Sequence, residues 1–270
     1  MAKFRLLHQL LQGQGLARAD QFVEPLPAPR RWLELVHGQR YHQAFARGEL
    51  THAEQRRIGL PATTPLVQRT WLAVGGTVLT ARLALERGLA CHLAGGTHHA
   101  FPDHGSGFCI FNDCAVAARV LLAEGAIERL MVIDLDVHQG DGTARIMAGR
   151  DDIITLSIHA EKNFPVRKAR STHDIGLPDG TGDADYLAAL EPALSALLAR
   201  HRPQLVLHQS GVDPHRDDRL GRLALTDDGL AAREALVARL AGRAGAALAV
   251  TLGGGYATDP ADVARRHALA

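Results

Sequence analysis

The sequence predicts an α/β fold with a mainly parallel central sheet. Short apolar segments of strand length alternate along the chain with longer amphipathic segments of helix length. This alternation is typical of parallel strands joined by right-handed helical crossovers. Most of the strand-like segments are also apolar throughout, as expected when helices cover both faces of a sheet.

Residues 1–65 are expected to form a helical part of the same domain. Residues 3–8 have the amphipathic pattern of a helix rather than the apolar core of a signal peptide. Prolines between residues 25 and 29 break the polar stretch into separate pieces. Beyond Pro65, an Ala- and Leu-rich segment up to Arg87 predicts a long helix that ends at Gly88.

Strands and helices then alternate to the end of the chain. The predicted strands cover residues 89–94, 129–135, 153–158, 204–208 and 247–252, and the predicted helices cover residues 113–124, 183–200 and 226–244. No Pro- or Ser-rich linker and no repeat of solenoid length interrupts the series. We therefore expect residues 1–270 to form a single domain.

The composition limits the class of protein. The hydrophobic fraction of 46% is ample for a large core, whereas aromatic residues make up only 4%, so we expect a core of Leu, Val and Ala. The formal net charge of +1 provides no overall attraction to nucleic acid or to a membrane surface. No apolar stretch approaches the length of a membrane span. The Ala-, Leu- and Arg-rich composition favours a bacterial source.

The cysteines indicate a reducing compartment. The chain has 3 cysteines, an odd number, and none of them forms a CxxC pair. This usage argues against a disulfide framework. Together with the absence of a signal-like segment, it predicts a cytoplasmic protein.

Residues 130–143 carry the most unusual chemistry of the sequence. An apolar run ends abruptly in Asp134, Asp136 and His138. Charged groups at a strand end are costly to desolvate unless they are paired or bind a metal. Asp136 and His138 project to the same side of an extended chain, which favours a zinc-type site. The alternative is a helix N-terminus that Asp134 or Asp136 caps.

Polar residues follow almost every predicted strand. They are residues 95–99 (GGTHH), residues 136–141 (DVHQGD), His159, residues 209–213 (QSGVD) and residues 253–256 (GGGY). Open parallel sheets bind ligands in the crevice beyond the carboxyl ends of their strands. We therefore expect these five segments to meet at one site.

Three of these residues can hold a catalytic metal. Asp136, His138 and Asp213 supply two carboxylates and one imidazole, which leaves a coordination position open for water and substrate. The alternative for Asp213 is a turn residue ahead of a proline. His98 and His99 follow two glycines and point to different sides, so one ring can face a metal water while the other supports it.

Further residues can assist such a centre. Asp134 and Asp141 can accept hydrogen bonds from the far ring nitrogens of the two histidines. Three glycines, including Gly254, would let the backbone approach a substrate and would place the Tyr256 phenol beside a developing oxyanion. The alternatives for this segment are a flexible turn or a weak phosphate loop, although the GxGxxG spacing is absent.

An apolar wall is also available. Gly107 and Phe108 would supply it, although Phe108 is equally consistent with an ordinary core residue. Cys109, next along the chain, is expected to pack rather than to act as a nucleophile.

Four linked motifs resemble the zinc-dependent histone deacetylase superfamily in order and spacing. They are His98-His99, residues 134–143 (DLDVHQGDGT), Gly211-Val212-Asp213 and residues 253–256 (GGGY). The resemblance covers residues 70–256, and residues 161–171 (EKNFPVRKARS) are similar to the class IV branch and its bacterial relatives. It implies an arginase-like, three-layer α/β/α domain.

The resemblance also implies roles for these residues. Asp136, His138 and Asp213 would bind Zn²⁺, or alternatively Fe²⁺. His99 would act as general base and then general acid with Asp141 as its partner. The remaining implied roles are electrostatic support from His98 paired with Asp134, carbonyl polarisation by Tyr256, and an acyl-lysine tunnel lined by Gly107 and Phe108. A structural K⁺ site would fall on Asp134, Ser157 and the backbone carbonyls of Asp136, His138 and Ile158.

Three departures from the family pattern carry expectations of their own. Relatives begin with a further segment, including a strand, ahead of the position of Met1, so that edge of the sheet is expected to differ. A second tunnel aromatic is replaced by Leu177 ahead of Pro178, which would admit acyl groups larger than acetyl. Asp141 is asparagine in many class IV relatives, and its carboxylate is expected to make His99 more basic.

The predicted activity is removal of acetyl or longer acyl groups from lysine side chains of proteins or peptides. A deacetylase of small acylated amines, such as acetylpolyamines, is the nearest alternative. An arginase-like ureohydrolase would need further aspartates for a second metal ion, and the sequence lacks them. A catalytically inactive acyl-lysine-binding regulator would be expected to have lost a ligand, His99 or Tyr256, and all are present. The sequence determines neither the physiological target nor the oligomeric state.

Overall fold

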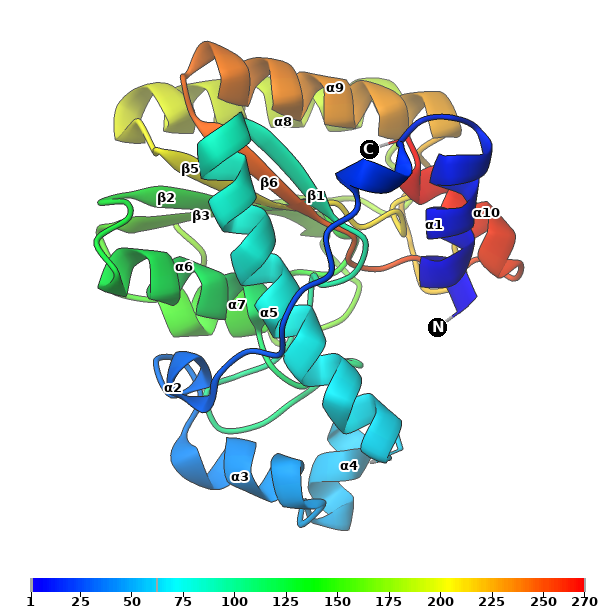
Figure 1. Cartoon of the computed structure of the whole chain (residues 1–270). Coiled ribbons are helices and arrows are strands. Elements are labelled where there is room, and N and C mark those ends of the chain that lie inside the picture. The colour runs from blue at the N-terminus through cyan, green and yellow to red at the C-terminus, as the bar shows by residue number, and fades with distance from the viewer. Residues whose placement is uncertain (1, 62, 270) are drawn as a thin grey trace.

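A six-stranded parallel sheet forms the centre of the computed structural model, which describes residues 2–61 and 63–269 (Figure 1). Its strands are β1 Leu89–His92, β2 Leu130–Asp134, β3 Ile153–Ala160, β4 His173–Leu177, β5 Leu205–Gln209 and β6 Ala247–Thr251. They are arranged in the order β1-β6-β5-β2-β3-β4, and every neighbouring pair is parallel. The predicted α/β class with a parallel sheet is therefore confirmed.

Helices cover both faces of this sheet (Figure 1). One face packs against α5 Thr64–Arg87, α6 Asp113–Ala123 and α7 Asp141–Met147. The opposite face packs against α8 Asp183–His201 and α9 Asp227–Arg243. The result is the three-layer α/β/α arrangement that the family resemblance implies.

The two faces explain why the central strands lack alternation. In β2, Leu130 and Val132 belong to the core on the α5–α6 side, whereas Met131 and Ile133 belong to the core on the α8–α9 side. Successive side chains of a strand point to opposite faces. Because both faces are apolar, the strand is apolar at every position.

The elements missed by the sequence prediction have weak local patterns. β4 is a polar edge strand in which Leu177 is the only buried residue. Its position is set by parallel pairing with β3, where Ser157 pairs with Asp174. Short helix α7 begins at Asp141, directly after the segment that carries the metal-ligand candidates.

The N-terminal residues form short helices around this core. They are α1 Ala2–Gly13, the 3₁₀ helix Ala19–Gln21, α2 Arg30–Leu33, α3 Gln39–Arg47 and α4 His52–Ile58. Helix α1 lies beside α10 Pro260–His267, so the first and last helices of the chain are neighbours (Figure 1). Across residues 2–61 and 63–269, no helix combines the length and apolarity needed to cross a membrane.

Candidate active site and metal centre

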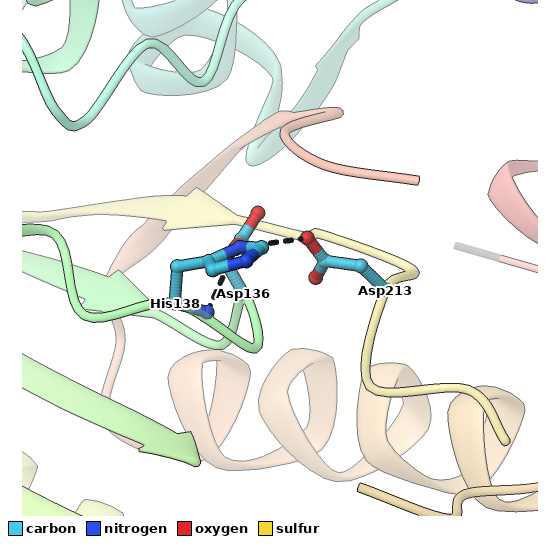
Figure 2. A group of neighbouring side chains, drawn as sticks. All are labelled: Asp136, His138 and Asp213. Atoms are coloured by element: carbon cyan, nitrogen blue, oxygen red, sulfur yellow. Dashed lines mark hydrogen bonds and ion pairs between the residues drawn. The ribbon is translucent and has the colours of Figure 1, made fainter. Parts of the chain in front are cut away.

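The carboxyl ends of β2 and β5 bring the metal-ligand candidates together. Asp136 and His138 follow β2, and Asp213 follows β5. His138 Nδ1 lies 3.0 Å from Asp136 Oδ1 and 3.2 Å from Asp213 Oδ2. All three side chains are buried and converge on one point, as Figure 2 shows. The ligand atoms lie within 4.8 Å of one another, so a single cation could contact all of them.

The hydrogen bonds around these residues fit a bound cation. Backbone N–H groups of Val137 and Gly254 donate to Asp213 Oδ1 and Asp136 Oδ2 at 2.8 Å each. By contrast, Asp213 Oδ2 is buried and accepts no hydrogen bond of suitable geometry from the described residues, and its nearby polar contact is His138 Nδ1 at 3.2 Å. A buried carboxylate oxygen without a donor is costly unless a cation is present. Two carboxylates and one imidazole are also a suitable donor set for zinc.

Glycine is needed at position 254. A Cβ atom there would overlap Asp136 Oδ2 and Asp213 Oδ2. Its backbone N–H already donates to Asp136. The glycine-rich segment therefore packs directly against the metal-ligand candidates and closes one side of the site.

The tandem histidines are each paired with a carboxylate. His98 Nδ1 lies 2.7 Å from Asp134 Oδ2, and His99 Nδ1 lies 2.7 Å from Asp141 Oδ1. The two ring centroids are 4.0 Å apart, and the His99 ring is 5.9 Å from that of His138. Each Nδ1–H donates to its carboxylate, so the Nε2 atom of each ring is not used in these pairs.

Aromatic rings surround this group. The Tyr256 ring centroid is 6.4 Å from that of His138 and 6.0 Å from that of Phe108. The Phe164 ring packs edge-on against His99 at 4.8 Å. Phe108 and Phe164 are 45% and 40% exposed, so both rings also reach solvent.

Gly107 packs closely against His99, and its role in lining an acyl-lysine tunnel stays a prediction. A Cβ at Gly107 would lie 2.7 Å from His99 Cδ2, so only glycine fits beside the histidine ring. The next residue, Phe108, has a φ of 64°, which is strained for a side chain of this size. Its N–H donates to Ile58 O at 2.8 Å, and this bond ties the turn to the end of α4.

Comparison with known proteins identifies the family. The histone deacetylase domain model matches residues 1–270. The chain belongs to the histone deacetylase family. It is 52% identical over 269 residues to an uncharacterized protein of Picosynechococcus sp. The alignment covers 100% of this chain and 90% of the relative.

Two further comparisons agree with this assignment. A histone deacetylase-like amidohydrolase of Pseudomonas aeruginosa is 34% identical over 273 residues, covering 93% of this chain and 70% of that one. The crystal structure of an HDAC homolog from Aquifex aeolicus superposes with a TM-score of 0.85 at 25% identity, covering 98% of this chain and 75% of that chain. The family is one of hydrolases, and the arginase-like deacetylase fold is therefore shown.

The structure adds an aromatic ring that the sequence analysis did not anticipate. Phe164, in the loop after β3, lies beside His99. Leu177 is buried at the end of β4. Admission of acyl groups larger than acetyl stays a prediction. A phenylalanine next to proline within a basic loop was the available sequence signal.

Asp218 is a residue of this family member that the sequence reading missed. Its Oδ2 accepts a hydrogen bond from Tyr256 N at 2.6 Å, and its Oδ1 accepts from Leu220 N at 2.9 Å. Asp218 thus connects the loop after Asp213 to the segment that carries Tyr256. An aspartate in a charged loop is expected to be exposed to solvent. No local sequence pattern therefore identifies Asp218 as part of the site.

The charges differ between the two adjacent histidines. Burial and the charge of His98 lower the pKa of His99 to about 4, although the Asp141 carboxylate acts in the raising direction, as expected. Burial also lowers the pKa of His98, but Asp134 and Asp136 outweigh it and raise the pKa to about 9. Burial, reinforced by Asp136, keeps the pKa of the Tyr256 phenol well above its usual value. His99 is therefore neutral, and the phenol remains a donor.

Two of the predicted potassium ligands lie on neighbouring strands. Asp134 and Ser157 are paired in the parallel register of β2 and β3. Ser157 Oγ lies 3.0 Å from His159 Nδ1, a contact that could hold the hydroxyl in place. Occupancy by K⁺ stays a prediction.

Proposed function

We propose that this protein is a zinc-dependent deacylase that hydrolyses the amide of acetyl-lysine or of longer acyl-lysine, with Fe²⁺ as the alternative metal. The observation that supports this most strongly is the buried group of Asp136, His138 and Asp213. Asp213 Oδ2 has no hydrogen bond of suitable geometry there, and a coordinated cation would compensate its buried negative charge. The group lies beside two histidine–carboxylate pairs and a tyrosine, so metal ligands, bases and an oxyanion donor meet at one place.

Asp136, His138 and Asp213 would hold the metal. A zinc ion bound there would lower the pKa of its water to roughly 7 and would polarise the amide carbonyl. Proton transfer and orientation of the amide would be carried out by the side chains around the metal.

His99 is suited to move the proton. Its Nδ1–H is held by Asp141, so Nε2 can take a proton from the attacking water and then give it to the leaving amine nitrogen. His98, paired with Asp134, would support the negative charge that develops at the site. The net reaction consumes one water and releases a carboxylic acid and a free amine.

The remaining residues would orient the amide. The Tyr256 hydroxyl would donate a hydrogen bond to the carbonyl oxygen as that oxygen becomes negative. Phe108 and Phe164 would pack along the alkyl part of the lysine side chain, with Gly107 leaving room beside His99. Gly254 would place backbone close to the acyl group.

Turnover tests this proposal directly. Metal-reconstituted protein is expected to hydrolyse fluorogenic acetyl-lysine or long-chain acyl-lysine peptides, and Asp136→Ala is expected to abolish hydrolysis. Asp185→Ala, which removes an exposed carboxylate from α8, is the matched control and should leave turnover unchanged.

The outcomes separate the alternatives. Hydrolysis that persists at the normal rate in Asp136→Ala contradicts the proposal. If the wild-type protein binds one metal yet leaves both peptides intact, an acetylpolyamine assay decides between a small-amine deacetylase and an inactive acyl-lysine-binding regulator. Either result would replace the lysine substrate proposed above.

A further inference from the structure

Helix α9 places a buried guanidinium beneath the metal-ligand candidates. Arg233 is fully buried, with 0% of its surface exposed, and it is the largest such side chain among the described residues. Its Nη1 donates to Leu135 O at 3.0 Å, and its Nη2 donates to Gly211 O at 2.9 Å. A charged side chain is rarely buried in this way unless its donors are used.

The two carbonyl groups belong to the two segments that carry the carboxylate ligands. Leu135 immediately precedes Asp136, and Gly211 lies two residues before Asp213. The segments are also in direct contact, because a Cβ at Gly211 would lie 2.9 Å from Asp136 Cα. Arg233 therefore bridges the backbone of both ligand-bearing segments at the points where they leave the sheet.

Neighbouring side chains hold the guanidinium in place. Glu234 Oε1 accepts a hydrogen bond from Arg233 Nε at 2.7 Å, and Glu234 Oε2 lies 2.7 Å from His208 Nε2. Burial raises the pKa of Glu234, but Arg233 and His208 outweigh it and hold that pKa well below its usual range. Because His208 is part of β5, the network connects α9 rigidly to the strand that leads to Asp213.

Stability alone is a poor explanation for this network. Buried ion pairs repay little more than their desolvation cost, and apolar side chains of similar volume often stabilise a core equally well. What an apolar side chain cannot do is donate two hydrogen bonds in fixed directions. The arrangement is therefore suited to holding two backbone segments at a set separation.

We propose that Arg233 is a positioning residue for the metal centre, setting the separation of Asp136 and Asp213 through their backbones. This inference rests on the metal-dependent function proposed above. Arg233 would contact neither the metal nor the substrate. Its substitution should therefore lower the affinity for the metal first. Loss of residues that orient metal ligands typically lowers metal affinity about 10- to 100-fold.

Two variants separate positioning from folding. Arg233→Met combined with Glu234→Met replaces the ion pair by apolar side chains, and Arg233→Lys keeps the charge but offers a single nitrogen. Arg239→Met, on the exposed face of the same helix, is the matched control. Zn²⁺ affinity of the metal-free full-length proteins would be measured by competition with a chromophoric chelator, alongside the thermal midpoint of each metal-free protein.

We expect the double variant to stay folded, with a lower thermal midpoint because the Leu135 and Gly211 carbonyls lose their donors, and to lose about 10- to 100-fold in Zn²⁺ affinity. Arg233→Lys should show a smaller loss, and Arg239→Met should show none. Wild-type affinity in the folded double variant overturns the inference, and if that variant does not fold, wild-type affinity in Arg233→Lys overturns it. Wild-type protein that binds no Zn²⁺ would instead refute the proposed function together with this inference.

Discussion

At the scale of single residues, backbone contacts hold the candidate catalytic groups in place. Tyr256 is the clearest case, since its own N–H is bound by Asp218 while its ring faces His138. The carboxylate can accept from the Tyr256 N–H and from the Leu220 and Gly221 N–H groups together. Asp218 thus fixes the backbone of Tyr256, and through it the orientation of the phenol.

We predict that Tyr256→Phe lowers kcat by about 10²- to 10³-fold, the usual cost of one oxyanion donor. Asp218→Asn should also lower kcat, because an amide nitrogen at the Oδ2 position cannot accept from Tyr256 N. If Asp218 acts through the phenol, its substitution should have little further effect in the Tyr256→Phe background. Steady-state kinetics of the two single variants and the double variant test this, and fully additive losses would contradict it.

At the scale of elements, the N-terminal helices support the histidine loop. His37, between α2 and α3, has its Nδ1 2.9 Å from Phe101 O, and its Nε2 accepts from Asn112 N at 3.0 Å. Asn112 caps α6 and donates to His98 O at 3.2 Å. Helical segments outside the family's central motifs therefore position one of the two histidines.

This contact predicts a pH dependence of stability. Burial lowers the pKa of His37 to about 4, and both ring nitrogens are used in the neutral form. Because the unfolded chain takes up this proton near pH 6.5 and the folded chain does not, the contribution of His37 is complete above pH 6.5 and is lost as the pH falls towards 4. At 1.36 kcal/mol per unit, this amounts to up to about 3 kcal/mol.

Denaturant unfolding of the wild type and of His37→Gln between pH 7 and pH 4.5 measures this contribution. The variant, which cannot titrate at this position, should lose less stability over the range. Equal losses would show that His37 does not carry the effect. Burial also lowers the pKa of His92 and His159, so part of the acid sensitivity should remain in the variant.

At the scale of the whole molecule, the two ends of the chain pack together behind the glycine-rich segment. Leu7 of α1 is 1% exposed and forms a small core with Leu252 and Ala264. Lys3 Nζ donates to Gly253 O at 3.0 Å. Because Leu252 leads directly into residues 253–256, the packing of α1 supports the segment that carries Tyr256.

We expect Leu7→Ala to lower the free energy of unfolding by about 2–5 kcal/mol, since it removes a buried side chain and leaves a cavity. Leu16→Ala, at a position that is 59% exposed, is the matched control and should change little. Urea denaturation measures both values. A Leu7→Ala protein as stable as the control would mean that α1 docks only loosely.

The sequence alone determined the class of fold and the chemistry at the strand ends. Apolar runs of strand length that alternate with amphipathic helices predict a parallel sheet, even when the order of the strands is unknown. Asp136, His138 and Asp213 follow such runs, so their meeting beyond β2 and β5 was predictable from the chain itself. The pairs of His98 with Asp134 and of His99 with Asp141, which the family resemblance implies, are also present in the structure.

Only the tertiary structure decided which distant residues support these groups. Phe164 lies beside His99, Asp218 binds the backbone of Tyr256, and Arg233 reaches the backbone beside Asp136. In the sequence, each belongs to a charged loop or an amphipathic helix, where such residues are ordinarily solvated. Their burial and contacts depend on strand order and helix packing, which bring together segments that are far apart in the sequence. No local sequence pattern indicates these contacts.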